Sequence, residues 1–231
     1  MEQKKSCFRI TLIGMAAMLA VPYVHAEPSR GFILERGTVA DLGEASVDLR
    51  TGSVDTSGGV RLGLPRSELV LNSSLEGGSR NDIALKWNFG TLNLGTSAPL
   101  QTAGYVGLSH FDLEGTDSET NFVVGGAFTM EWSDFLLNFN PSLMVADDDR
   151  DANIINLGVG AHLKLARISF GEFQPGVEFV YVNGGDFDDN LLSLGTRWIY
   201  NDRLTLDFSI VTNGARDLTS IPGVIRLNAA F

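Results

Sequence analysis

Residues 154–165 read IINLGVGAHLKL, and apolar side chains alternate there with polar residues or glycine. The apolar members occupy every second position from Ile155 to Leu165, and Asn156 and His162 fall between them. Successive side chains of a β-strand point to opposite faces, so a period of two predicts a strand with one apolar and one polar face.

The same alternation recurs in NFVVGGAFTMEW (121–132), DFLLNFNPSLMV (134–145) and RLTLDFSIV (203–211). No helical periodicity of useful length follows residue 42, so the sequence predicts an all-β fold. A water-soluble β-sandwich also alternates, and this alternative stays open on periodicity alone.

The connections between strands favour a different architecture. Strands meet tightly near Pro65, Gly90, Ser133, Ala166 and Asn201, and longer, mostly acidic connections lie between these points: EGGSRND (76–82), DLEGTDSET (112–120), ADDDRDAN (146–153), NGGDFDDN (183–190) and NGARDLTS (213–220). Successive antiparallel connections lie at opposite ends of a sheet, so all tight turns share one end. Short turns at one end and longer loops at the other are typical of transmembrane β-barrels.

Aromatic residues gather at the end with the tight turns. All three tryptophans lie within a few residues of such a turn, whereas a sandwich core would hold them in mid-strand. Amphipathic rings prefer the headgroup level of a membrane. We therefore predict interface aromatic residues at Trp87, Trp132, Trp198, Tyr200 and Phe231.

Counting alternating stretches gives about twelve strands over residues 43–231, in a closed antiparallel up-and-down transmembrane β-barrel. They are 43–54, 58–64, 67–76, 80–89, 91–112, 120–132, 134–146, 152–165, 167–183, 190–200, 203–213 and 221–231. The stretch 91–112 is long for one strand and contains Pro99, so ten or fourteen strands stay possible. Phe170 and Phe173 fall on opposite faces of one predicted strand, which predicts a β-bulge between them.

The N-terminus has the organisation of an export signal. Lys4, Lys5 and Arg9 precede the apolar run ITLIGMAAMLAV (10–21), and Val24 and Ala26 are the small residues before a cleavage site. The run is too short for a membrane-spanning helix, which needs about 20 residues. We predict a cleaved signal peptide at 1–26 and a periplasmic lead-in at 27–42, with a small plug as the alternative for the latter.

Charge and cysteine content narrow the functional class. Without residues 1–26, the 17 Lys and Arg become 14 and the 28 Asp and Glu become 27, a net charge near −13. Such an acidic surface repels phosphates and argues against nucleic acid as a partner. The only cysteine, Cys7, lies in the predicted signal peptide, and export without disulfides suits a Gram-negative envelope.

The last nine residues, GVIRLNAAF (223–231), form a strand that ends on an aromatic residue. With the features above, the chain resembles porin-like β-barrel proteins of the Gram-negative outer membrane. The resemblance implies contact with outer-membrane lipid and lipopolysaccharide, and recognition of Phe231 by the barrel-assembly machinery. Gly223, Ile225, Leu227 and Phe231 match the terminal pattern, whereas Ala229 is smaller than usual there. The terminal strand must also pair with the first, because an open edge in hydrocarbon leaves backbone groups unsatisfied.

Catalytic or cofactor chemistry has few candidates. The chain beyond the predicted signal peptide has two histidines, His110 and His162, and Ser109 next to His110 points to the opposite face. We expect neither enzyme activity nor a cofactor, and a lipid-acting barrel enzyme is the lesser alternative. The acidic loops could hold Ca²⁺ or Mg²⁺, but they lack EF-hand spacing, and solvated loops without a fixed ion are the favoured interpretation, so we assign no metal site.

The polar face of the strands predicts which residues line the lumen. These are Lys86, Glu131, Asn138, Asn140, His162, Lys164, Glu178, Arg197, Arg203, Asp207 and Arg226. Their mixed charges either line a water-filled passage or form a salt-bridged core that blocks it. About eight strands give a filled interior and sixteen an aqueous channel, and twelve lies between. We expect a small pore for passive diffusion of polar solutes or ions, with a structural or adhesive barrel without a pore as the alternative. The oligomeric state stays open.

Overall fold

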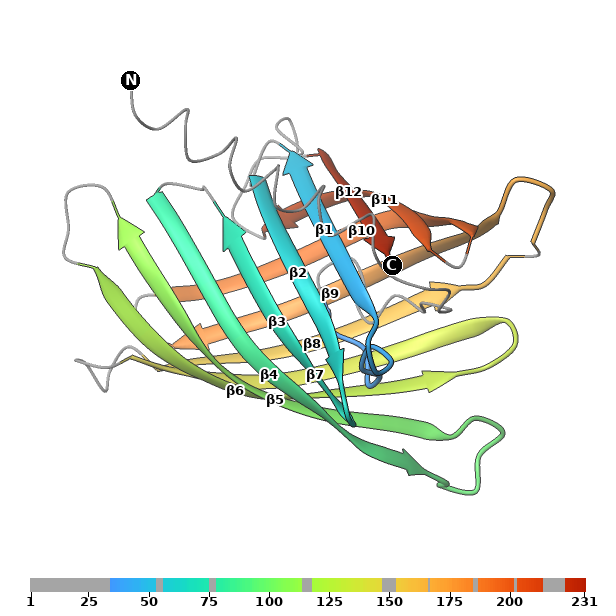
Figure 1. Cartoon of the computed structure of the whole chain (residues 1–231), viewed down its shortest axis with the longest axis horizontal. Coiled ribbons are helices and arrows are strands. Elements are labelled where there is room, and N and C mark those ends of the chain that lie inside the picture. Colours follow the sequence, from blue (N-terminus) through green and yellow to red (C-terminus); the bar gives the residue numbers. More distant parts are fainter. Residues whose placement is uncertain are drawn as a thin grey trace.

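The computed structural model describes residues 34–52, 56–74, 78–113, 118–146, 153–165, 167–184, 187–201, 203–213 and 223–231. In them, every regular element is a strand, and the twelve strands form one closed barrel (Figure 1). Each strand pairs antiparallel with its neighbour in sequence. The strands are β1 (Ala45–Gly52), β2 (Thr56–Leu64), β3 (Ser67–Ser74), β4 (Gly78–Leu92), β5 (Leu100–Leu113), β6 (Glu119–Glu131), β7 (Phe135–Ala146), β8 (Ile154–Leu163), β9 (Glu172–Gly184), β10 (Phe187–Asn201), β11 (Leu204–Asn213) and β12 (Gly223–Ala230). The predicted up-and-down barrel of twelve strands is confirmed.

The barrel closes where β12 meets β1. Their register runs from Ser46 opposite Ala230 to Gly52 opposite Val224. At the end of the seam, the Phe231 amide donates to the Ala45 carbonyl at 2.7 Å, and the Ala45 amide donates to the Phe231 carbonyl at 3.1 Å. The aromatic terminus is therefore part of the closure.

The two faces of the wall have opposite chemistry. Leu49, Val159 and Ile225 expose 50% or more of their surface, whereas Glu68 and Glu178 expose none. A water-soluble protein buries its leucines and exposes its carboxylates, and this barrel does the reverse. An apolar outer wall around a polar interior is the arrangement of a transmembrane barrel, and the sandwich alternative is wrong.

Two of the strand boundaries that differ from the predictions involve a glycine with a positive φ. Gly90, predicted as a tight turn, is part of a bulge in β4 with φ 96°, and the strand continues to Leu92. Gly171, with φ 121°, forms an isolated bridge with Ile168 and precedes β9. Phe170 thus lies in a turn and not in a strand, so the predicted bulge between Phe170 and Phe173 is wrong. The connections 93–99 and 164–171 are longer than the tight turns expected at this end.

The tryptophans lie at one end of the barrel, next to the connections of that end. Trp87 is paired with Ser67, the first residue of β3. The Trp132 ring stacks on Phe135 at 4.3 Å between centroids, and its indole N–H donates to Ser97 Oγ at 2.8 Å. Trp198 packs between Phe173 and Tyr200, with centroids 6.2 and 5.5 Å away. The strand pairing therefore brings these rings to the rim where Phe231 ends the chain.

Several predicted features fall outside the described residues. These include the signal peptide (1–26), residues 27–33 of the lead-in, residues 147–152 with Asp147, Asp148, Asp149 and Asp151, and residues 214–220. The longer connections predicted at EGGSRND and NGGDFDDN are wrong, because residues 78–82 belong to β4 and residues 183–184 and 187–190 belong to β9 and β10. Within the described ranges, no helix is long and apolar enough to cross a membrane.

Candidate functional site

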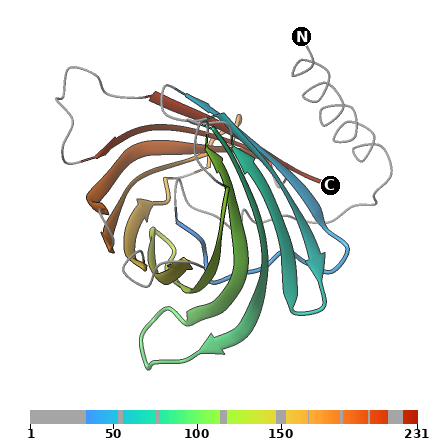
Figure 2. The same cartoon turned by 90° about the vertical axis from the view of Figure 1, so that its left-hand side faces the viewer.

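The interior of the barrel holds residues 34–40, which precede β1 in the chain. Residues 34–44 are here called the inner segment, and the first part of this segment lies inside the ring of strands, in blue in Figure 2. Four backbone amides of this segment donate to side chains of the wall: Leu34 to Glu178 (2.9 Å), Glu35 to Asn140 (2.6 Å), Gly37 to Thr129 (2.8 Å) and Ala40 to Glu68 (2.8 Å). The structure therefore places residues 34–40 of the predicted lead-in (27–42) against the inner side of the wall, which is the position that the plug alternative gives them.

Glycines of the wall make room for the inner segment. A Cβ at Gly160 of β8 would lie 3.1 Å from a terminal carbon of Leu34, and one at Gly158 would collide with the same side chain. Gly37 lies equally close to the wall, where a Cβ would overlap the carbonyl of Gln101. The glycine spacing in β8 thus provides a recess for the Leu34 side chain.

A cluster of four charged side chains connects the inner segment to β2, β3 and β4. We call Glu35, Arg61, Glu68 and Lys86 the Glu35 cluster. Arg61 contacts Glu35 at 2.7 Å and Glu68 at 2.6 Å, and the Lys86 ammonium lies 3.1 Å from Glu35 and 3.4 Å from Glu68. Arg61, Glu68 and Lys86 are almost fully buried, and Glu35 retains 22% side-chain exposure. Each buried charge in this cluster therefore faces one of opposite sign, which offsets the cost of its desolvation.

A second set of polar contacts lies at the same end of the inner segment, around Leu34 and the backbone of Glu35. His162 of β8 and Glu178 of β9 are in contact at 2.8 Å (Nε2 to Oε1), and both are buried. The second oxygen of Glu178 accepts the Leu34 amide, so one carboxylate joins two strands and the inner segment. The Asn140 side-chain amide accepts from the Glu35 backbone N–H and donates to its carbonyl at 2.9 Å.

The seam of the barrel carries its own charged cluster on the inner face. Asp48, Arg197, Asp207 and Arg226, here called the seam cluster, come from β1, β10, β11 and β12. Arg197 donates two parallel hydrogen bonds to the Asp207 carboxylate, from Nε to Oδ1 at 2.7 Å and from Nη2 to Oδ2 at 2.8 Å. Arg226 pairs with Asp48 across the seam and lies 3.5 Å from Asp207. The alternation of sign ties four adjacent strands together, including the first and the last.

Most predicted lumen residues lie in these contacts or beside them. The eight that are buried are Lys86, Asn138, Asn140, His162, Glu178, Arg197, Asp207 and Arg226. Glu131 and Lys164 are partly exposed and form an ion pair of 2.7 Å. Arg203 is exposed, because it belongs to the turn before β11 and the alternation of that strand begins only at Leu204.

The charged residues of the interior that were missed from the sequence include Glu35, Arg36, Asp48, Arg61 and Glu68. The signal for three of them was present, because each is a charged residue in a strand where the neighbouring positions are mostly apolar, as in VRL around Arg61. Glu35 offers no such signal, since residues 27–42 do not alternate.

The base of the inner segment is joined to β2 by backbone hydrogen bonds. The Gly43 amide donates to the Gly63 carbonyl at 3.1 Å, and the Gly63 amide donates to the Glu44 carbonyl at 2.8 Å. The Glu44 side chain is buried beside this contact and accepts the Asp41 amide at 2.9 Å. Burial raises the pKa of the Glu44 carboxyl above its usual value, although the Asp41 amide opposes the shift.

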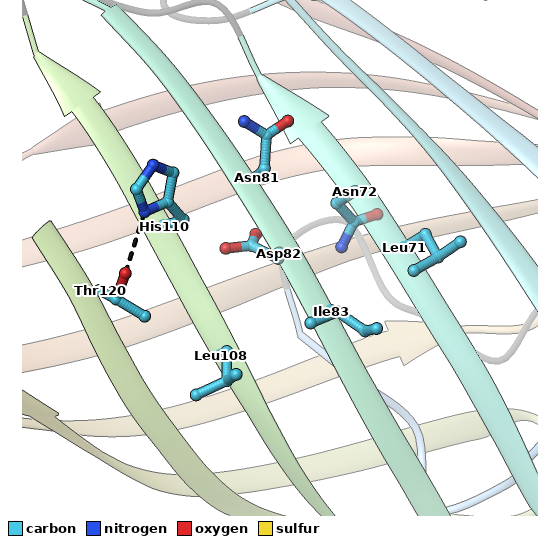
Figure 3. A pocket seen from close by; sticks show the side chains of 8 residues that line it. All are labelled: Leu71, Asn72, Asn81, Asp82, Ile83, Leu108, His110 and Thr120. Carbon is cyan, nitrogen blue, oxygen red and sulfur yellow. Dashed lines mark hydrogen bonds between the residues drawn. The ribbon is translucent and has the colours of Figure 1, made fainter. Parts of the chain in front are cut away.

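A shallow depression lies on the outer wall near the beginning of β4 (Figure 3). It has a volume of about 550 Å³, and His110 and Thr120 form a 2.9 Å hydrogen bond at its edge. Ser109 is buried and donates to Asp82 at 2.5 Å, whereas His110 is exposed. The two adjacent residues therefore point away from each other, and this pair does not form a nucleophile and its base. No group of three or more potential metal ligands occurs within the ranges that the structure describes.

Comparisons with known proteins agree with this architecture. No protein-family model matches the sequence, and no curated protein matches it. Among solved structures, the KdgM porin in complex with disordered oligogalacturonate superimposes with a TM-score of 0.53 at 7% identity, over 81% of this chain and 98% of the other. The chain has the fold of an outer-membrane porin. A membrane protein from a study of in-meso crystallization superimposes with a TM-score of 0.50 at 11% identity, over 82% of this chain and 83% of the other. A BenF-like porin from Pseudomonas fluorescens Pf-5 gives 0.41 at 10% identity, over 79% and 57%.

Proposed function

We propose that the protein is an outer-membrane pore for the passive diffusion of small polar solutes or ions. The observation that carries the proposal is the reversal of polarity across the wall, in which exposed leucines surround buried charged side chains. The outer face requires lipid, because its apolar area would otherwise contact water. The inner face requires water or ionic partners, because charges are costly in an apolar medium.

The proposed location is the outer membrane of a Gram-negative bacterium, reached by export with a cleaved signal peptide. The apolar wall would contact lipid and lipopolysaccharide directly. Phe231 supports recognition by the barrel-assembly machinery, since it follows β12 directly and bonds through its backbone to Ala45 beside the seam. We assign no enzyme activity, because His110 faces outward and His162 is held by Glu178.

The pore we propose is narrow. Twelve strands leave an interior between the filled core of the smallest barrels and the open channel of large porins. Part of that interior is taken by the inner segment, whose backbone is bonded to side chains of β3, β6, β7 and β9. The expected conductance is therefore below that of a barrel of the same strand number with an open lumen.

Conductance of the purified barrel in a planar bilayer tests this function. Discrete, ohmic current steps are the expected result, and heat-dependent mobility of the same preparation on a gel checks that the barrel is folded. Folded protein that inserts and stays silent at every voltage would contradict the pore.

Silence would favour a second function, a structural or adhesive barrel without a pore. This alternative is supported by the ion pairs that join neighbouring strands within the lumen and by the inner segment itself. Binding of the folded protein to lipopolysaccharide in the absence of conductance would support it.

A further inference from the structure

Within the Glu35 cluster, Glu35 is held as a bound carboxylate ligand would be held. Both of its oxygens are engaged: Oε1 by Arg61 Nη2 at 2.7 Å, and Oε2 by Arg61 Nη1 and Lys86 Nζ, each at 3.1 Å. A planar guanidinium that meets two carboxylate oxygens is the usual geometry of carboxylate recognition in proteins. Arg61 and Lys86 thus present a preformed fork, with 4% and 2% side-chain exposure, toward a group with 22% exposure.

The wall and the inner segment contribute unequal charge to this cluster. Arg61, Lys86 and Glu68 belong to the strands β2, β3 and β4 of the wall, and together they carry two positive charges and one negative. The second carboxylate comes from Glu35, outside any strand. The wall therefore supplies both cations, and Glu35 is the carboxylate of the inner segment that contacts both of them.

The attachment of Glu35 differs in kind from that of the wall residues. Between Leu34 and Ala40, four backbone amides donate to side chains of the wall. Such contacts can be released without breaking the hydrogen-bonded ladder of the barrel. The base at Gly43 and Gly63 would stay joined by its backbone bonds while residues 34–40 move.

We propose that Arg61 and Lys86 form a binding site for carboxylate-bearing solutes in the lumen, and that Glu35 occupies this site as an internal competitor that such solutes displace. The proposal rests on the proposed pore, because the solute must reach the lumen. It also names the class of solute that the pore favours. Neutral solutes of the same size gain nothing at this site, since they offer no charge to the two cations.

Displacement can be measured without current, by the accessibility of a cysteine in the inner segment. Thr38→Cys provides the reporter, because the only native cysteine lies in the predicted signal peptide. Its rate of labelling by a maleimide is followed with sodium malonate, with neutral malonamide, and with sodium chloride at equal ionic strength. Malonate should raise the rate about tenfold, which corresponds to about 1.4 kcal/mol, and the other two should not.

Two variants in this background separate the proposed site from general charge effects. Glu35→Gln should label about tenfold faster without malonate, a shift of about 1.4 kcal/mol. Glu131→Gln is the matched control, because Glu131 has 25% side-chain exposure and a 2.7 Å ion pair but touches neither Arg61 nor Lys86. It should label as the parent does and keep the malonate response, whereas Lys86→Met should lose that response. Equal labelling with malonate and malonamide in the parent would overturn the proposal.

Block of the current by malonate distinguishes failure of the site from failure of the pore. Glu35→Gln lacks the internal competitor, so its current should be blocked at a malonate concentration about tenfold lower than that for the parent, again about 1.4 kcal/mol. The malonate concentration that blocks Glu131→Gln should lie within twofold of the parent value. A conducting barrel in which Glu35→Gln and the parent are blocked equally refutes the site and leaves the pore. A silent barrel whose labelling still responds to malonate refutes the pore and leaves the site.

Discussion

Replacing Asp48 with asparagine tests whether the seam cluster holds the barrel closed. Asp48 lies in the first strand and pairs with Arg226 in the last, and their side chains are 8% and 4% exposed. The substitution keeps the size of the side chain and removes its charge. Arg226 then remains buried, with Asp207 as the nearest carboxylate that the described contacts offer, at 3.5 Å.

The expected loss of unfolding free energy is about 3 kcal/mol. Removing one partner of a buried ion pair costs roughly 3 to 5 kcal/mol, because the other charge stays buried without compensation. The lower end of this range applies here, since Asp207 can compensate Arg226 in part. Asp207 is already held by Arg197 at 2.7 and 2.8 Å, so its compensation is incomplete.

The assay is denaturant unfolding of the refolded barrel in lipid vesicles, followed by tryptophan fluorescence and extrapolated linearly to zero denaturant. The second variant, Arg226→Gln, and the double variant complete a double-mutant cycle. The double variant should lose less than the sum of the single losses, by about 2 kcal/mol or more, because no unpaired charge remains. Glu131→Gln is the control, since its partly exposed pair should contribute less than about 1 kcal/mol. A loss below about 1 kcal/mol for Asp48→Asn, or additive single losses, would refute the role of this pair in closure.

Three further perturbations follow from single residues. Gly171→Ala should cost about 1 to 3 kcal/mol of unfolding free energy, because φ is 121° and the new Cβ would lie 2.5 Å from the Ile199 carbonyl oxygen. Gly223→Ala is the control, because its new Cβ would have no neighbouring atom within 4 Å, and it should change the unfolding free energy by less than about 0.5 kcal/mol in the same titration. Trp132→Ala should cost about 1 to 2 kcal/mol through loss of the Phe135 stack and the hydrogen bond to Ser97, measured as a lower temperature of gel-mobility change. Glu44→Gln should flatten the pH dependence of the unfolding free energy. The raised pKa of Glu44 means that the folded state binds this proton more tightly than the unfolded state does. The stabilisation from Glu44 therefore grows as the pH falls through the raised pKa, and it is complete below the usual pKa of 4.5. Unfolding titrations of parent and variant between pH 7 and pH 4 check the sign, and equal slopes would contradict it.

The strands were predictable from the sequence because each one separates two different media. In β8, the residues from Ile155 to Leu163 on the outer face are apolar or small, since they meet lipid, and the intervening positions are glycine or polar. This constraint acts on single residues at a local period, so it is visible without knowledge of the rest of the chain. The same holds for Phe231, whose position at the seam follows from the need to close the barrel.

The strand boundaries misplaced at Gly90 and Gly171 show where a local pattern carries too little information to locate the end of a strand. A glycine with positive φ serves equally as a turn residue or as the extra residue of a bulge. Gly90 is part of a bulge, and β4 continues beyond it through Thr91 and Leu92, which pair with β5. At Gly171 it ends a turn, which removes Phe170 from the strand and with it the apparent conflict of faces. The choice depends on the partner strand, which local periodicity does not specify.

The inner segment was unpredictable for a stronger physical reason, and this reason bears on function. Its backbone amides are satisfied by side chains 28 to 144 positions away in the chain, so no alternation of its own is needed. The charge of the lumen therefore does not follow from the wall alone. The wall residues Arg61, Lys86 and Glu68 together carry a net positive charge. When Glu35 is in contact with them, the four side chains carry two positive and two negative charges. An ion selectivity inferred from the wall residues alone would thus apply to the barrel only when residues 34–40 have left their contacts. Conductance measured on the parent protein would report on the barrel with Glu35 bound to Arg61 and Lys86.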